Sequence, residues 1–174
     1  MAANDSFDIL GLEPTFALDL ELLERRHREL SRALHPDRHA AGGAAGRRLA
    51  LGKAIEVNEA YRALRDPVRR AEILLQRRGI RTGETYEPKA DPELLMEIME
   101  KREALGDARR ARDLDALHRL GAEVRVRESA TSQALLVDFA SSGDASERIV
   151  KRLGELRYYR RFLDEASAIE DDLS

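Results

Sequence analysis

One short segment of the sequence combines an imidazole, a proline and a carboxylate, His35-Pro36-Asp37. Apolar side chains recur at helical intervals over residues 20 to 34, which predicts a helix that ends at this segment. Proline cannot continue a helix, and it biases the residue before it away from helical backbone angles. The sequence therefore predicts an imidazole and a carboxylate held in a tight loop at a helix end.

The same loop contains a possible set of metal ligands, because His35, Asp37 and His39 alternate along it. Imidazole and carboxylate groups suit several divalent metals, so an enzyme with a metal site is one hypothesis. No second group of histidines and carboxylates stands out, since His27 and His118 lie in helical patterns. We therefore expect no metal, no cofactor and no enzymatic activity.

Composition and charge exclude several further classes of protein. Charged residues make up 36% of the 174 residues and aromatic residues 5%, which favours a helical protein with solvated faces. The absence of cysteine excludes disulfides and thiolate metal sites. A net charge of -3 gives no overall basic field for nucleic acid. No apolar run is long enough for a membrane span and no signal peptide is evident, so we expect a soluble, cytoplasmic protein.

The predicted helix before the motif has two contrasting faces. Leucines 23, 30 and 34 fall on one side, which should pack, and Arg25, Arg28 and Arg32 fall on the opposite side. Glutamates at i,i+4 spacing could make the arginine face an ordinary solvated surface. The planar guanidinium groups of such a face are suited to bidentate contacts with carboxylates. Interleaved glutamates and the near-balanced total charge argue against nucleic acid as the partner.

Three more helical segments are predicted around this one in the first half of the chain. A helix from about residue 47 to 65 should form an antiparallel pair with the preceding helix. Asp66-Pro67 is typical of a helix start, and that helix should continue to residue 78. A short helix is expected over residues 7 to 12. The residues of the second helix expected to pack against the first are Leu51, Ile55, Asn58, Tyr61 and Leu64.

The second half of the chain predicts a linker and three further helices. Residues 79 to 91 lack apolar periodicity, and Asp91-Pro92-Glu93 starts a helix that should extend to about Leu105. Helical patterns follow over residues 108 to 139 and from Asp144 to about residue 171. Short connections between the three helices predict an antiparallel three-helix bundle. The sequence thus predicts an all-α protein.

The first bundle helix has more apolar surface than one buried face requires. It carries two stripes, turned away from each other, and methionines beside carboxylates suggest an adaptable binding surface. Burial on two sides is the other interpretation, and periodicity does not decide between them. The stripes are Leu94, Ile98 and Leu105 for the first, and Leu95, Met96 and Met99 for the second, with Glu100 and Glu103 beside it.

Helix, His-Pro-Asp loop and helix near the N-terminus resemble the J-domain of DnaJ-type co-chaperones. A J-domain followed by a small helical bundle is similar to the HscB family, the J-type co-chaperones of iron–sulfur cluster assembly. This resemblance covers nearly the whole chain, including residues 7 to 12, 70 to 75 and 95 to 103. The Gly/Phe-rich and cysteine-rich segments of ordinary DnaJ proteins are absent. The cysteine-rich zinc segment of eukaryotic relatives is absent too, so we expect a bacterial-type member.

The resemblance implies a J-domain over residues 1–78, a linker over 79–91 and a scaffold-binding three-helix bundle over 92–174. It also implies a co-chaperone that stimulates the ATPase of an HscA/DnaK-type chaperone and delivers the iron–sulfur scaffold IscU to it. A J-domain adaptor with a different client is the alternative. The implied chaperone-binding residues are His35, Pro36, Asp37, Arg25, Arg28, Arg32 and Arg38, the last replacing a common lysine. The implied scaffold-binding residues are Leu95, Met96, Met99, Glu100, Glu103 and Tyr158, the last replacing a usual phenylalanine.

Overall fold

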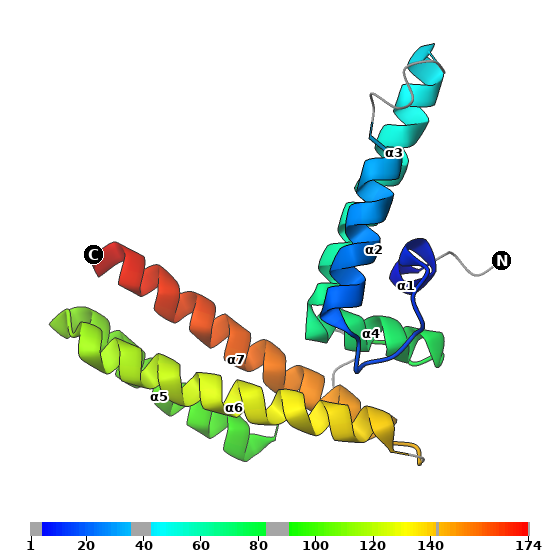
Figure 1. Ribbon diagram of the computed structural model, residues 1–174. Coiled ribbons are helices and arrows are strands. Elements are labelled where there is room, and N and C mark those ends of the chain that lie inside the picture. Colours follow the sequence, from blue (N-terminus) through cyan, green and yellow to red (C-terminus); the bar gives the residue numbers. More distant parts are fainter. Residues whose placement is uncertain (1–4, 36–42, 83–90, 142, 174) are drawn as a thin grey trace. The chain divides into compact units, whose positions relative to one another are not determined.

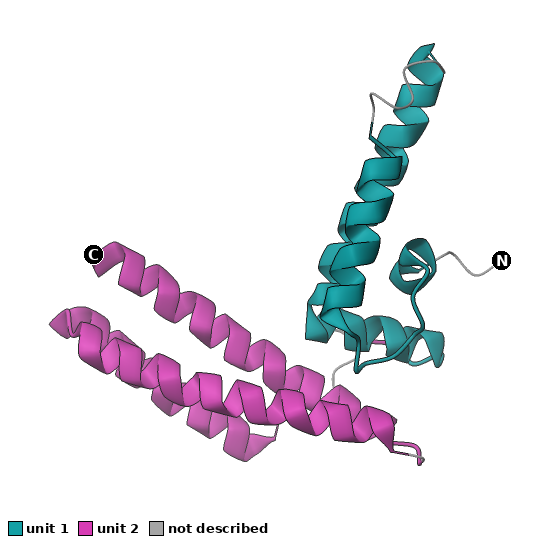
Figure 2. Ribbon diagram, in the orientation of Figure 1, with its two compact units in different colours: residues 1–80 teal, residues 81–174 magenta. Residues whose placement is uncertain are grey.

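The structure is a computed structural model that describes residues 5–35, 43–82, 91–141 and 143–173. These residues form seven helices and no strand, as the sequence predicts. Contacts within the chain divide it into two compact units, residues 1–80 and residues 81–174 (Figure 2). Most of the predicted linker, residues 83–90, lies outside the described residues.

The first unit is built around an antiparallel pair of helices (Figure 1). These are α2 (Leu20–Ala33) and α3 (Gly43–Arg65). The unit also contains α1 (Ser6–Leu10), which precedes the pair, and α4 (Pro67–Arg77), which follows it. The predicted start of α4 is confirmed, because the Asp66 side chain accepts a hydrogen bond of 2.8 Å from the Val68 N–H and Pro67 occupies the first turn. The largest fully buried side chains of this unit are Phe7, Leu10, Leu23, Leu64 and Leu75.

The buried side of α3 differs from the predicted one. Leu51 and Ile55 were expected to pack against α2, and they are 53% and 50% exposed. Helix α3 packs against both α1 and α2, so its buried side is centred between the two neighbours. The helix also begins at Gly43, four residues before the predicted start. Its buried residues are Ala50, Val57, Ala60 and Leu64, of which only the last was predicted.

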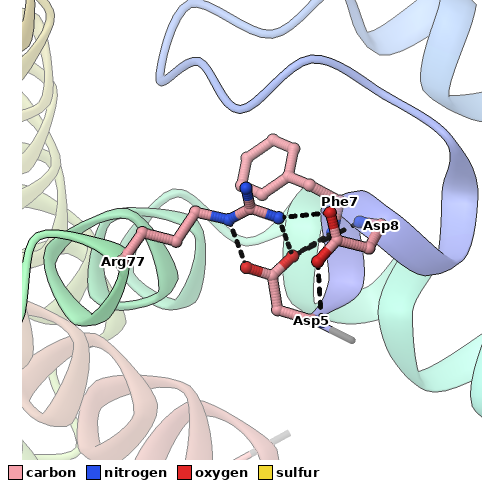
Figure 3. Close-up of polar contacts among 4 residues, drawn as sticks. All are labelled: Asp5, Phe7, Asp8 and Arg77. Carbon is pink, nitrogen blue, oxygen red and sulfur yellow. Dashed lines mark hydrogen bonds and ion pairs between the residues drawn. The ribbon is translucent and has the colours of Figure 1, made fainter. Parts of the chain in front are cut away.

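A charged contact joins the two ends of the first unit (Figure 3). The Arg77 guanidinium, in the last turn of α4, donates hydrogen bonds of 2.7 Å to Asp5 and to Asp8, and it lies 5.7 Å from the centre of the Phe7 ring. Asp5 is also the N-cap of α1, accepting 2.9 Å from the Phe7 N–H. Arg77 therefore fixes α1 against α4 across 72 residues of sequence.

We expect Asp5→Asn to lower the free energy of unfolding by about 1 kcal/mol at neutral pH, because asparagine can still cap the helix but loses the charged contact with Arg77. Burial by itself would raise the pKa of Asp5, but hydrogen bonds from Arg77 and from the Phe7 and Asp8 backbone lower it below 3.8. A depressed folded-state pKa gives stability that is present above the unfolded value and lost as the pH falls through the folded value. Urea unfolding, followed by circular dichroism, should therefore show the deficit above pH 3.8 and a shrinking deficit below it. A deficit independent of pH would contradict this assignment.

The second unit consists of three helices, each antiparallel to the next along the chain (Figure 1). They are α5 (Pro92–Ala111), α6 (Leu114–Ala140) and α7 (Ser146–Leu173). The predicted start of α5 is confirmed, since the Asp91 side chain accepts 3.1 Å from the Glu93 N–H. The bundle core includes the fully buried Leu105, Leu117, Leu135, Ile149, Leu153, Leu156 and Phe162.

The break between α5 and α6 lies six residues later than predicted. Helix α5 was expected to end near Leu105, but Gly106 and Asp107 continue it to Ala111. A glycine inside a helix costs only about 1 kcal/mol, and the added turn buries Ala108. The chain instead turns at Arg112, whose φ of 54° is left-handed, and Asp113 then caps α6 by accepting 2.9 Å from the Ala116 N–H.

Candidate functional site

The three arginines predicted as a docking surface lie on the exposed side of α2. Arg25, Arg28 and Arg32 are exposed, while Leu23 on the other side is buried. Arg28 donates 3.0 Å to Glu24, so one of the expected i,i+4 pairs is present. A pair this exposed contributes little to stability. Arg25 and Arg32 lie on the same face as Arg28, so the basic surface extends beyond the Arg28–Glu24 ion pair.

Arg26, which the sequence did not single out, has a structural role. Its Nε donates 3.3 Å to the Leu10 carbonyl at the end of α1, and its Nη1 donates 3.1 Å to Glu29. The side chain therefore holds α2 against α1 on the side away from the predicted docking surface. No local sequence signal distinguishes it from its neighbours Arg25 and Arg28.

The His-Pro-Asp motif is described only at its first residue. Helix α2 ends at Ala33 with Leu34 as its C-cap, and His35 follows it, exposed. Pro36, Asp37 and Arg38, together with His39 of the metal hypothesis, lie outside the described residues. Over the part of the chain that is described, no group of three histidines and carboxylates could hold a metal ion.

The contact of His27 with α3 sets the register of the α2 and α3 pair that carries the motif. The His27 Nε2 and Asn58 Oδ1 atoms are hydrogen bonded at 2.8 Å, and the His27 ring stacks on Tyr61 with 4.2 Å between centres. Asn58 and Tyr61 therefore do contact α2, as the sequence predicts. The contact fixes which residues of α2 and α3 lie at the same level.

The second apolar stripe of α5 is exposed rather than buried. Met96 is 63% exposed, Met99 70% and Leu95 38%, whereas Ile98 and Leu105 of the first stripe are 5% and 0% exposed. Glu100 and Glu103 beside the stripe are exposed as well. Of the two interpretations left open by periodicity, the structure therefore selects a solvent-facing apolar surface with an acidic border.

Tyr158 of α7 lies next to this surface. Helices α5 and α7 run in the same direction. Three ion pairs join α7 to α5 or to its N-cap residue, and in each pair the α7 residue comes about 60 positions after its partner. Tyr158 occupies the same side of α7 as these partners, so it lies half-buried at the level of Leu95 and Met96. The pairs, with their distances, are Asp91–Lys151 (3.0 Å), Arg102–Glu165 (3.2 Å) and Arg109–Asp172 (3.0 Å).

Further charged contacts hold the bundle helices that support this surface. Lys101 donates 2.7 Å to Glu123 of α6, and this hydrogen bond lowers the pKa of the Glu123 carboxyl. Asp138 of α6 is buried. Burial would raise its pKa, but hydrogen bonds of 2.6 Å from Arg152 and 3.0 Å from Arg148 lower it. These contacts join α6 to each of its two neighbouring helices.

Comparison with known proteins identifies the family. The co-chaperone protein HscB homolog of Burkholderia multivorans is 39% identical over 167 residues, which cover 95% of this chain and 93% of the relative. The chain belongs to the HscB family of co-chaperones. The HscB homolog of Paraburkholderia phymatum is 41% identical over 149 residues, with 84% of this chain and 85% of the relative covered.

Family models match both halves of the chain. Residues 5–73 match the DnaJ domain, and residues 90–167 match the HSCB C-terminal oligomerisation domain. HscB proteins are non-enzymatic J-domain co-chaperones, so the partner class of this chain is a DnaK-type chaperone. Membership of the family is consistent with a role in iron–sulfur cluster assembly.

Solved structures of HscB proteins share the fold. The chaperone HscB from Vibrio cholerae superposes with a TM-score of 0.82 at 31% identity, covering 98% of this chain and 99% of its own. The crystal structure of human co-chaperone protein HscB superposes with a TM-score of 0.86 at 24% identity, covering 98% of this chain and 84% of its own. This likeness supports the fold alone. The predicted all-α fold with a J-domain is therefore confirmed. Within the described residues, no helix has the length and apolar character needed to cross a membrane.

Proposed function

We propose that this HscB-family chain stimulates the ATPase of an HscA-type chaperone and delivers the iron–sulfur scaffold protein IscU to it. Cluster transfer and the maturation of iron–sulfur proteins would follow, in the cytoplasm. The observation that carries the proposal is the exposed Leu95, Met96 and Met99 stripe, because a folded bundle gains nothing by leaving these side chains in water. It lies in a different unit from the J-domain, as a two-partner adaptor requires.

The α5 surface suits a protein partner that is apolar and basic. Leu95, Met96 and Met99 offer apolar area, and unbranched methionines can adapt to the shape of a partner. Glu100 and Glu103 make no ion pair with the described residues of the chain, so they are available to basic groups at the border of an interface. Tyr158, at the edge of α5 and α7, adds an aromatic ring beside the same stripe.

The α2 surface suits the chaperone. Arg25, Arg28 and Arg32 are exposed on one face, and His35 follows at the end of the same helix, where Pro36, Asp37 and Arg38 continue the motif. The arginines orient the chaperone through its carboxylates. His35 and Asp37 then favour the chaperone conformation that hydrolyses ATP, without acting on the nucleotide themselves.

The test is the ATPase rate of an HscA-type chaperone with this chain, with IscU, and with both. We expect the chain alone to raise the rate and the chain with IscU to raise it by more than the sum of the separate effects, because the chain brings scaffold and chaperone together. If the chain stimulates the chaperone, but IscU neither changes this stimulation nor binds the chain in isothermal titration, scaffold delivery would be overturned. The chain would then be an adaptor for a different client.

A further inference from the structure

Two apolar side chains of α3 have no role in the fold or in the surfaces described above. Leu51 and Ile55 are half exposed, although the periodicity of α3 predicts them to be buried. They are one turn apart, so they form a continuous apolar spot on the surface of the first unit. The exposed Arg48, three residues before Leu51, borders this spot at one end, and the exposed Asn58 and Glu59 follow Ile55 at the other end.

The contact between His27 and Asn58 shows where this apolar spot lies. Because α2 and α3 are antiparallel, each turn back along α3 from Asn58 corresponds to a turn forward along α2 from His27. Ile55 therefore lies at the level of Leu30 and Ser31, and Leu51 at the level of Leu34, immediately before His35. The spot is thus beside the end of α2 that carries the His-Pro-Asp motif.

The spot also faces the same side of the helix pair as the basic surface. Asn58 meets His27 at the exposed edge of the pair, and Leu51 and Ile55 continue the Asn58 side of α3 further outward. On α2, Arg28 and Arg32 continue outward from His27 on that same edge. The two helices therefore present one surface, which is basic on α2 and apolar on α3, with Arg48 at the outer end of the apolar spot.

We propose that Leu51 and Ile55 form the apolar half of the surface that binds the DnaK-type chaperone. This inference rests on the proposed docking of the α2 arginines, and it adds that the chaperone offers an apolar spot bordered by carboxylates. Charged contacts steer and orient a partner, whereas buried apolar area contributes most of the affinity. The basic surface of α2 alone would steer and orient the chaperone but would contribute little apolar area.

Charge complementarity selects the chaperone over the other occupants of such a spot. A scaffold that matches Glu100 and Glu103 on α5 is basic at its interface, so Arg48 and the neighbouring Arg28 and Arg32 of α2 would repel it. A second copy of this chain would bring the same arginines against each other. An acidic partner, the kind that the α2 arginines also require, is the one that fits.

The test compares the full chain with the double variant Leu51→Ser and Ile55→Ser. The chaperone ATPase is measured as a function of co-chaperone concentration. We expect the concentration for half-maximal stimulation to rise about tenfold, as expected for two half-exposed apolar side chains that become buried. The maximal rate should stay the same, because the His-Pro-Asp motif is unchanged.

Leu49→Ser is the matched control. Leu49 is 65% exposed on the same helix, but it lies two residues from Leu51 and is therefore turned to the other side. Both variants introduce serine into α3, and equal helix content by circular dichroism checks that both fold. An unchanged half-maximal concentration for the double variant, or an equal rise for Leu49→Ser, would overturn the inference. Absence of stimulation by the unmodified chain would instead overturn the proposed function.

Discussion

His35→Gln is expected to reduce stimulation of the chaperone ATPase at least about tenfold while leaving the melting temperature unchanged. His35 is exposed and lies beyond the last turn of α2, so its replacement removes no core packing. Glutamine keeps a polar side chain of similar size, but it lacks the imidazole that we propose acts on the chaperone. Single-turnover ATP hydrolysis measures the first effect, and thermal unfolding by circular dichroism measures the second.

His118→Gln provides the control for this variant. His118 is also an exposed histidine, but it lies on α6 and is hydrogen bonded to Glu170 at 2.8 Å. Its replacement should leave ATPase stimulation unaltered. Full stimulation by the His35 variant would show that the first residue of the motif is not needed, and the assignment of the chaperone-binding residues would then be wrong.

The double variant Leu95→Ala and Met99→Ala is expected to raise the dissociation constant for IscU by about 10- to 100-fold. Losing the burial of these two side chains at an interface costs about 1.4–2.8 kcal/mol in total, and residues at the centre of an interface carry most of its affinity. Both side chains are already exposed in the unbound bundle, so their truncation leaves no cavity in the core. Isothermal titration with the full chain and IscU measures the change.

The matched control is Val126→Ala with Val137→Ala. These valines are 69% and 70% exposed on α6, about as exposed as Met99, and they lie outside the proposed scaffold surface. IscU affinity should be the same with and without this control change. If the Leu95 and Met99 variant also binds IscU as tightly as the unmodified chain, the exposed stripe of α5 is not the scaffold surface.

The His35 variant and the Leu95 and Met99 variant should lose different properties, because the chaperone and IscU bind different units of the chain. The His35 variant should bind IscU with normal affinity and give no ATPase response to it. The Leu95 and Met99 variant should stimulate the chaperone on its own, but IscU should add little. Loss of both properties in either variant would contradict an adaptor with two independent surfaces.

The fold class and most helix boundaries follow from local patterns in the sequence. Asp66-Pro67 and Asp91-Pro92 start helices because a capping carboxylate and a proline act within a single turn, which needs no tertiary partner. The two stripes of α5 were predictable for the same reason, since helical spacing alone sorts side chains into faces. The motif and the order of the helices were enough to indicate the family.

Which of several apolar faces became buried, by contrast, depends on how the helices pack against one another. Periodicity gives a face but not its neighbour, and α3 turns Leu51 and Ile55 outward because it packs between α1 and α2. Arg77 contacts Asp5, and Tyr158 lies at the level of Leu95. In both cases the two residues are more than 60 positions apart in the sequence. Such pairings depend on how whole helices pack, and that packing determines which side chains remain exposed for a partner to bind.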